Sequence, residues 1–274
     1  MSAEIRNALH DTSGRVGIAY SGGVDSSVLA LLTARAIGRE RTILLLGQSA
    51  SLAKREHRFA VRQARQLGLA VVPIETHELR DENYSANPVD RCYYCKNELF
   101  SQIDADVALT LNLNAVAYGE NADDSRQLDR PGGRAAREHH VLYPLATAGA
   151  TKADVRAIAQ HFGLISADKP AAPCLASRIP HGEPVTEKKL QQVDEAEDAV
   201  LAAGFSDCRV RHHGTVARIE LPADEISRLS DDKLRQVLTQ AIKAAGFRHV
   251  CVDLAGIQSG AFTLSIISPG GRRG

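Results

Sequence analysis

The chain has 274 residues, of which 44% are hydrophobic and 24% charged, and its 33 basic residues balance 33 acidic ones. This composition excludes a largely disordered chain. Zero net charge also disfavours a nucleic-acid partner, because nucleic-acid-binding surfaces are normally basic. Apolar runs such as residues 43–46 are far shorter than the ~20 residues of a membrane helix, and the first residues do not resemble a signal peptide. We therefore expect a cytoplasmic protein without a membrane partner.

Short apolar runs alternate with helical patterns through the first two thirds of the chain. Strands are predicted at residues 16–20, 42–46, 70–74 and 116–118, and helices at 26–37 and 54–67. Strands that alternate with helices are typical of a parallel sheet with helices on both faces. The sequence therefore predicts an α/β fold with a doubly wound parallel sheet in residues 1–180.

The last third has a different pattern. Helices are predicted at residues 187–203 and 232–245, and strands at 208–212, 216–221 and 249–254. The phrase Ala-Gly-Phe recurs at 203–205 and 245–247, each time between a helix and a strand, where glycine suits a left-handed helix cap. We predict a smaller C-terminal α+β domain over residues 185–274, built from a weak internal repeat, with the linker near 180–184.

A glycine turn follows the first predicted strand, in the string Ser-Gly-Gly-Val-Asp-Ser at residues 21–26. Glycine lets the backbone approach an anion, and the N-terminus of the next helix offers free N–H groups and a positive dipole end. The hydroxyl groups add donors, and the carboxylate can hold Mg²⁺ against phosphates. The alternative is a glycine-rich turn with a purely structural role. The predicted ATP-binding residues of this turn are Ser21, Gly22, Gly23, Asp25 and Ser26.

This string, in its strand–turn–helix setting, resembles the phosphate loop of the PP-loop ATP pyrophosphatases, which cleave ATP between its α and β phosphates. No lysine follows the glycines, so the loop is not of the Walker type. In that superfamily the end of the second strand lies beside adenine. The resemblance therefore implies adenine contacts at Gln48 and Ser49.

The chain has five cysteines, an odd number that argues against a complete disulfide framework. Cys92 and Cys95 form a C-x-x-C pair, and Cys174 stands alone. Three thiolates would fill three of the four ligand positions of a 4Fe–4S cluster and leave one iron open. A redox dithiol, a zinc site completed by His181, and unliganded core thiols are the alternatives. The remaining two cysteines lie in predicted strands, where core packing is expected.

Six stretches give the chain a closer resemblance. They are SGGVDS at 21–26, RCYYCK at 91–96, YGENADDSRQLDRPG at 118–132, KPAAPCLASRIPHG at 169–182, RVRHHGTVARIELP at 209–222 and VDLAGIQSG at 252–260. In this order they resemble the LarE family of ATP-dependent sulfur transferases, which mature the nickel-pincer cofactor of lactate racemase. The resemblance covers nearly the whole chain.

The resemblance implies a reaction. In that family ATP adenylylates a carboxylate of a pyridinium dicarboxylate mononucleotide, and a sulfur nucleophile displaces AMP to leave a thiocarboxylate. One subgroup sacrifices a single cysteine, at the position of Cys174. A second subgroup has three cysteines and is thought to bind a 4Fe–4S cluster that delivers sulfide. This chain has all three, Cys92, Cys95 and Cys174, and is therefore assigned to the cluster subgroup.

The resemblance also implies partners and further site residues. The partners are a small nucleotide substrate, a sulfide donor and further copies of the chain in a homo-oligomer, with the C-terminal domain serving substrate binding and assembly. The expected catalytic residues are Asp25 and the three cysteines, and Asp25, Glu120 and Asp123 are candidates to hold Mg²⁺. Residues expected to bind the substrate's phosphate or carboxylates are Ser177, Arg178, Arg209 and Arg211.

One departure from the family pattern concerns the C-terminal motif. The family usually carries arginine there, whereas this chain has Gln258 and Ala261. The missing positive charges would suit a substrate with a different acidic group, or a paralogue that acts outside lactate racemase maturation.

Three other functions compete with sulfur transfer to this nucleotide. A tRNA thiolation enzyme shares the phosphate loop but needs a broad basic surface. An ammonia-using ligase of the NAD synthetase type has no use for three converging cysteines. A zinc-stabilised module that senses ATP would bind the nucleotide without cleaving it. The sulfur transferase is the function that the combined motifs favour.

Overall fold

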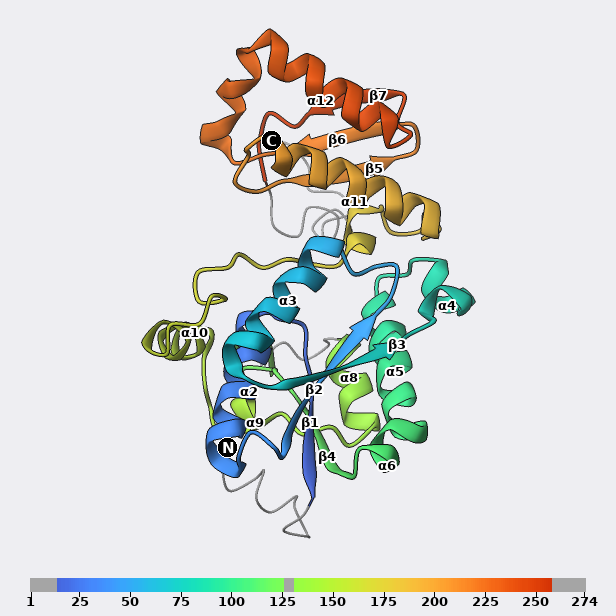
Figure 1. Ribbon diagram of the computed structural model, residues 1–274. Coiled ribbons are helices and arrows are strands. Elements are labelled where there is room, and N and C mark those ends of the chain that lie inside the picture. Colours follow the sequence, from blue (N-terminus) through green and yellow to red (C-terminus); the bar gives the residue numbers. More distant parts are fainter. Residues whose placement is uncertain (1–13, 126–130, 258–274) are drawn as a thin grey trace, which may run out of the picture. The chain divides into compact units, whose positions relative to one another are not determined.

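The computed structural model describes residues 14–125 and 131–257. Contacts divide the chain into two compact units, shown in Figure 1. The first unit contains residues 1–81 and 90–172, and the second contains residues 82–89 and 173–274. Gln258 and Ala261, the two positions of the C-terminal departure, lie outside the described residues.

The first unit is built on a four-stranded parallel sheet with strand order β3-β2-β1-β4. The strands are β1 (Arg15–Ala19), β2 (Thr42–Gln48), β3 (Ala70–Glu75) and β4 (Leu113–Tyr118). Strands β2 and β3 follow one another on one side of β1, whereas β4 lies on its other side, so the strand order reverses between β1 and β4. In open α/β sheets, ligands bind at such switch points, at the carboxyl ends of the strands. The predicted parallel sheet is confirmed.

Helices cover both faces of this sheet (Figure 1). Along β2 successive side chains alternate: Leu44 and Leu46 join one buried cluster, and Ile43 and Leu45 join another. The first cluster includes residues of α2 (Val24–Ile37), α3 (Lys54–Leu67) and α10 (Lys152–His161), and the second includes residues of α5 (Arg91–Gln102) and α8 (Pro131–Glu138). A strand buried on both sides explains why residues 42–46 are apolar throughout. The predicted doubly wound arrangement is confirmed.

Short helices fill the connections of the chain. They are η1 (Glu78–Arg80), α4 (Glu82–Ser85), η2 (Ile103–Val107), α6 (Ala108–Thr110), α7 (Ala122–Ser125), α9 (Pro144–Thr147), η3 (Leu175–Arg178) and η4 (Ala223–Ser230). Helix α5 was not predicted, and it carries the C-x-x-C pair on its first turns.

The second unit is an α+β fold, as predicted. Its elements are α11 (Glu187–Ala202), β5 (Arg209–His213), β6 (Val216–Glu220), α12 (Asp232–Ala244) and β7 (His249–Val252). Strand β6 pairs antiparallel with β5 and parallel with β7. The two Ala-Gly-Phe phrases follow the two long helices in equivalent ways. Gly204 and Gly246 have φ of +89° and +105°, and Phe205 and Phe247 are buried in one core.

Residues 82–89 belong to the second unit although residues on both sides of them belong to the first. The Asn87 side chain is completely buried and donates to the carbonyl oxygens of Ile179, Pro180 and Glu183 at 3.3, 2.7 and 3.0 Å. Asn87 adopts a φ of +58°, a conformation that asparagine tolerates better than most residues. The chain therefore passes between the units three times.

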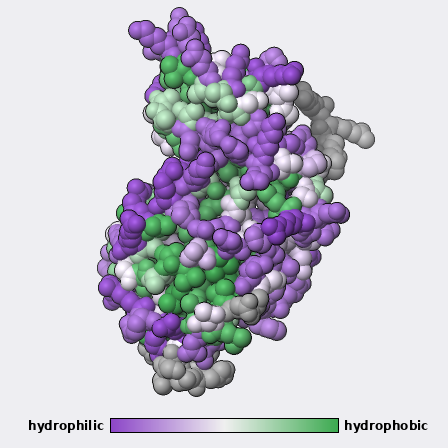
Figure 2. All heavy atoms as spheres, turned by 45° about the vertical axis from the view of Figure 1, so that its right-hand side comes forward, coloured by the Kyte–Doolittle hydropathy of each residue, from purple (hydrophilic) through white to green (hydrophobic). Residues whose placement is uncertain are grey.

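None of the helices in the described ranges is long and apolar enough to cross a membrane. Figure 2 shows hydrophilic side chains over most of the visible face, with apolar side chains gathered on part of the first unit.

Candidate active site

The predicted phosphate loop lies between β1 and α2 and is packed against α3. Gly22 has a φ of +71°, and a Cβ atom added to it would lie 2.6 Å from the Cα atom of Ala60. Only glycine fits here, because a helix backbone cannot move aside. The Tyr20 hydroxyl donates to the Ala60 carbonyl oxygen at 3.2 Å, and burial raises the pKa of Tyr20 to about 12. The loop is thus fixed to α3 at two points.

Hydrogen bonds within the loop orient its hydroxyl groups. The Ser26 hydroxyl donates to the Gly23 carbonyl oxygen at 3.1 Å, and the Gly23 N–H donates to Ser21 Oγ at 3.3 Å. The loop leads into the N-terminus of α2, a helix of 14 residues. Unpaired N–H groups and the positive end of the helix dipole at this point are suited to bind a phosphate.

The end of β4 contacts the start of α2 through Gly119. A Cβ atom on Gly119 would lie 2.7 Å from the Ser26 backbone nitrogen, so any other residue would displace the loop. A cavity of about 210 Å³ opens here, and its lining includes Ser21, Gly23, Asp25, Ser26, Lys96 and Gly119. All five predicted loop residues except Gly22 line this cavity. Gly22 instead makes the contact with α3.

Lys96 is a cavity residue that was missed in the sequence analysis. Its Nζ lies 4.1 Å from the centre of the Tyr118 ring, so the ring face supports the ammonium group. Lys96 follows the C-x-x-C pair directly, four residues after Cys92. Helical spacing of four places two side chains on one face, and this signal could have linked Lys96 to the cysteines had α5 been predicted.

Asp25 has two polar neighbours. Its Oδ1 accepts a hydrogen bond from Asn121 Nδ2 at 3.0 Å, and its Oδ2 forms an ion pair with Lys152 Nζ. The same Asn121 amide donates to Asp124 Oδ2 at 2.8 Å. Lys152 begins α10, and its backbone N–H donates to Asp123 Oδ2 at 2.8 Å. Lys152 was also missed, because only the fold brings it 127 positions back to the loop.

The three candidates for Mg²⁺ differ in their surroundings. Glu120 is buried and accepts from the Ser125 hydroxyl at 2.6 Å, whereas Asp123 receives the Lys152 N–H described above. Within residues 14–125 and 131–257, no three His, Cys, Asp or Glu side chains form a group that could hold a metal ion. Mg²⁺ in nucleotide sites commonly takes one or two carboxylates and completes its shell with phosphates and water. Binding of Mg²⁺ by Asp25, Glu120 or Asp123 remains a prediction.

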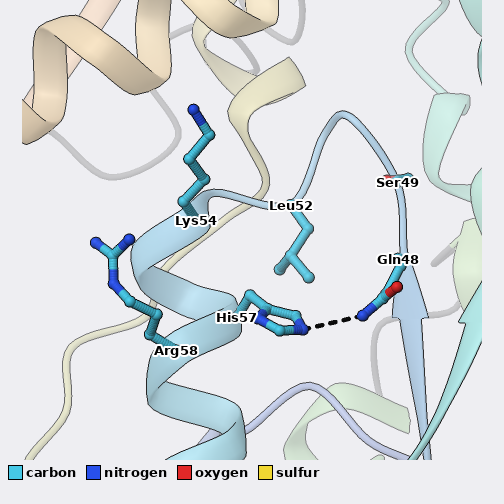
Figure 3. Close-up of a pocket in the computed structure, with 6 residues that line it drawn as sticks. All are labelled: Gln48, Ser49, Leu52, Lys54, His57 and Arg58. Atoms are coloured by element: carbon cyan, nitrogen blue, oxygen red, sulfur yellow. Dashed lines mark hydrogen bonds between the residues drawn. The ribbon is translucent and has the colours of Figure 1, made fainter.

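A second pocket, of about 360 Å³, lies between the end of β2 and the start of α3. Its lining residues are Gln48, Ser49, Leu52, Lys54, His57 and Arg58. Figure 3 shows Gln48 and His57 reaching toward one another, with Nε2 of each 3.0 Å apart, while Lys54 and Arg58 extend away. The two residues predicted beside adenine, Gln48 and Ser49, therefore line a pocket at the carboxyl end of the sheet.

The three predicted cluster cysteines fall in both units. Cys92 and Cys95 lie three residues apart on α5 in the first unit, a spacing that puts both thiols on one face of the helix. Cys174 is exposed and precedes η3 in the second unit. None of the five cysteines is in a disulfide. Core packing was predicted for the remaining two cysteines: Cys208 is buried in the second core, as predicted, but the prediction is wrong for Cys251, which is exposed.

Two buried arginines hold the segment that carries Cys174. Arg178 donates from Nε and Nη2 to Glu197 at 2.8 and 3.3 Å, and from Nη1 to the Pro173 carbonyl oxygen at 2.9 Å and the Ser177 hydroxyl at 2.8 Å. Arg211 pairs with Glu220 and donates from Nη1 to the Ser177 carbonyl oxygen at 3.1 Å. Both guanidinium groups therefore shape the loop around Cys174.

The other predicted substrate contacts lie near this loop or on β5. The Ser177 hydroxyl donates to the Cys174 carbonyl oxygen at 2.7 Å. Arg209, two residues before Arg211 on β5, donates to the Cys208 carbonyl oxygen at 2.6 Å and pairs with Asp207. Substrate binding by these residues remains a prediction.

A parallel sheet with a glycine turn after its first strand, a helix N-terminus behind that turn and an acidic residue inside it defines an enzyme of the PP-loop ATP pyrophosphatase class. Comparison with known proteins agrees, since the family described as NAD synthase matches residues 3–89.

Two relatives match over most of their length. An uncharacterised protein of Synechocystis is 42% identical over 246 residues, which is 90% of this chain and 91% of that protein. The pyridinium-3,5-bisthiocarboxylic acid mononucleotide synthase of Lactiplantibacillus plantarum is 33% identical over 248 residues, 90% of this chain and 88% of that enzyme. The chain belongs to the LarE family, of which that synthase is a member.

Proposed function

We propose that this protein uses ATP to adenylylate a carboxylate of a pyridinium dicarboxylate mononucleotide and then replaces the AMP with sulfur, which leaves a thiocarboxylate. The main support is that one chain combines the phosphate loop at residues 21–26 with Cys92, Cys95 and Cys174, in a relative of a synthase named for such a product. A carboxylate oxygen is a poor leaving group, whereas AMP is a good one. Adenylylation therefore makes the acyl carbon open to attack.

In this proposal the first cavity receives the phosphates of ATP. The N–H groups at the start of α2 and the hydroxyl group of Ser21 bind them, Ser26 lines the same cavity, and Lys96 brings a positive charge to it. Lys152 adds a second cation beside Asp25. Mg²⁺ held by Asp25 would neutralise the charge that develops on pyrophosphate as it leaves. Asp25 is a suitable ligand because its carboxylate lies inside the loop that binds the phosphates.

The sulfur step is assigned to the three cysteines. Their thiolates fit an iron–sulfur centre, because thiolate is the usual protein ligand of such clusters. A 4Fe–4S cluster held by Cys92, Cys95 and Cys174 would supply sulfide at the iron that has no protein ligand. The chain's own contribution is to hold Cys174 in a fixed loop, through the contacts of Arg178 and Arg211.

The closing test of the reaction is direct. The purified protein is incubated with ATP, Mg²⁺, sulfide and pyridinium-3,5-dicarboxylic acid mononucleotide, and the products are analysed by mass spectrometry. We expect pyrophosphate, AMP and a nucleotide in which sulfur has replaced oxygen. Release of pyrophosphate only when ammonia is the nucleophile would instead identify a ligase, and no release at all would contradict the proposal.

The cluster has its own test. After anaerobic purification we expect about four irons per chain, and a steep loss of iron when Cys92, Cys95 or Cys174 is changed to Ala. Cys251→Ala is the matched control, because Cys251 is exposed like Cys174 but lies outside the set. Zinc in place of iron would contradict the cluster. An intact mass lowered by one H₂S after turnover would show a sacrificed cysteine instead.

Three further properties remain predictions: a sulfide donor as partner, assembly into a homo-oligomer and a cytoplasmic location.

A further inference from the structure

Ser49, in the second pocket, belongs to a chain of hydrogen bonds that ends on a buried carboxylate. Ser49 Oγ lies 2.8 Å from Ser51 Oγ, and the Ser51 hydroxyl donates to Glu78 Oε1 at 2.9 Å. The Ser51 N–H also donates to Ser49 Oγ at 3.2 Å. Glu78 is only 2% exposed, so water does not compete for this end of the chain.

The hydrogen-bonded chain joins the carboxyl ends of two neighbouring strands. Ser49 follows β2, and Glu78 begins η1 just after β3. The Thr76 N–H donates to the Gln48 carbonyl oxygen at 3.0 Å, which fixes the two strand ends against each other. Ligands of open α/β sheets bind at this edge, and Ser49 lines the pocket there.

The carboxylate sets the direction of every hydrogen bond in this chain. Ser51 has one hydroxyl hydrogen, and it is used on Glu78. The hydrogen between the two serines must therefore come from Ser49. Ser49 Oγ also accepts the Ser51 N–H, so its remaining capacity is one lone pair. Toward the pocket, Ser49 is an acceptor and not a donor.

The other oxygen of Glu78 argues that the carboxylate is not there for stability. Among the described residues, Oε2 of Glu78 is buried without a hydrogen-bond partner. Burying an unpaired carboxylate oxygen is unfavourable for folding. A neutral side chain would serve a purely structural role better. A carboxylate, by contrast, can never donate to Ser51, so it cannot reverse the direction of these hydrogen bonds.

We infer that Glu78, acting through Ser51, fixes Ser49 as a hydrogen-bond acceptor that selects adenine over guanine. This inference rests on the proposed function, because it requires that the protein binds ATP. The inference itself adds that the base of ATP occupies the second pocket. Adenine carries an amino group at position 6 that donates to such an acceptor, whereas guanine carries a carbonyl oxygen there, which would face a second acceptor. Leu52 supplies apolar surface in the same pocket. Glu78 and Ser51 are thus positioning residues for base selection.

The test compares dissociation constants for ATP and GTP, measured by titration calorimetry on the full-length chain. Ser51→Ala frees the Ser49 hydrogen to turn toward the pocket, so we expect the preference for ATP to fall about tenfold, the factor for one hydrogen bond of ~1.4 kcal/mol. Ser51→Thr keeps the hydroxyl group and should keep the preference. Ser49→Ala removes the acceptor itself and should weaken ATP binding without improving GTP binding.

Glu78→Gln provides a second variant, because its amide can offer Ser51 either an oxygen or an NH₂ group. We expect a preference between those of the wild type and Ser51→Ala. Thermal unfolding of each variant separates a folding defect from a change in selectivity. If Ser51→Ala and Glu78→Gln bind ATP and keep the full preference, the inference is wrong while the proposed function stands. If the wild-type protein does not bind ATP, the proposed function itself fails.

Discussion

The buried ion pair between Arg178 and Glu197 allows a quantitative test of how the Cys174 loop is held. The side chains are 1% and 0% exposed, and two hydrogen bonds join them. Arg178→Met removes the guanidinium group but keeps an unbranched side chain that replaces the apolar part of the arginine. The Glu197 carboxylate would then be buried without the Arg178 guanidinium, although it still accepts the Val210 N–H, at 2.9 Å.

The expected loss is large because the Arg178 guanidinium no longer offsets the desolvation cost of Glu197. Removing one partner of a buried ion pair costs about 3–5 kcal/mol. The double variant Arg178→Met/Glu197→Gln removes the carboxylate charge as well, and the glutamine oxygen can still accept from Val210. For it we expect a loss of about 1–2 kcal/mol. The double variant should therefore be more stable than the single one.

Urea unfolding followed by circular dichroism gives the free energies, since the chain has no tryptophan to report by fluorescence. Hydrogen exchange of the α11 and β5 amides assigns the change to the second unit. Arg235→Met is the matched control: its pair with Asp232 is exposed, and such pairs contribute below about 1 kcal/mol. If Arg178→Met costs no more than this control, or if the double variant is no more stable than the single one, the reasoning is refuted.

Three further predictions concern the loop and the second core. Lys152→Met removes the cation beside Asp25 and should weaken ATP binding at least about tenfold, a loss of ~1.4 kcal/mol. Titration calorimetry measures the affinity for ATP, and Lys152→Arg should recover part of that affinity. Gly119→Ala puts a methyl group 2.7 Å from the Ser26 nitrogen and should cost about 1–3 kcal/mol of stability, measured by urea unfolding; an unchanged midpoint would contradict this contact. His212 is 2% exposed, burial lowers its pKa, and its Nδ1 has no partner within the described residues. A lowered folded-state pKa means stability that is present above about pH 6.5 and lost as pH falls through the folded-state value. The unfolding free energy of His212→Gln should therefore depend less on pH between about 5 and 7 than that of the wild type. If the two proteins change in stability equally with pH, this role of His212 is contradicted.

The fold was predictable because local patterns and global packing agree. The apolar run at 42–46 is buried on both faces, and the alternation of strands with helices is what the parallel sheet requires. The glycine turn could also be predicted from the sequence, because a strand, two glycines and the start of a helix occur within a few residues. Each of these signals is local in sequence.

The parts that escaped prediction depend on distant contacts. Lys152 reaches Asp25 across 127 positions, and no local pattern marks it. Lys96 carried a signal, its spacing from Cys92, but that signal has meaning only on a helix, and the C-x-x-C pair was not assigned to one. The burial of Arg178 and Arg211 was invisible as well, because arginine is normally exposed and only their acidic partners permit burial.

The membership of residues 82–89 in the second unit affects how the protein can be divided. A fragment that begins at Pro173 lacks Asn87, the side chain that ties together the carbonyl groups of Ile179, Pro180 and Glu183. A fragment that ends at Ala172 carries the opposite defect, an octapeptide whose natural docking surface has been cut away. Neither half is a self-sufficient piece of sequence. A clean separation would need residues 82–89 to be excised from one gene segment and grafted in front of the other.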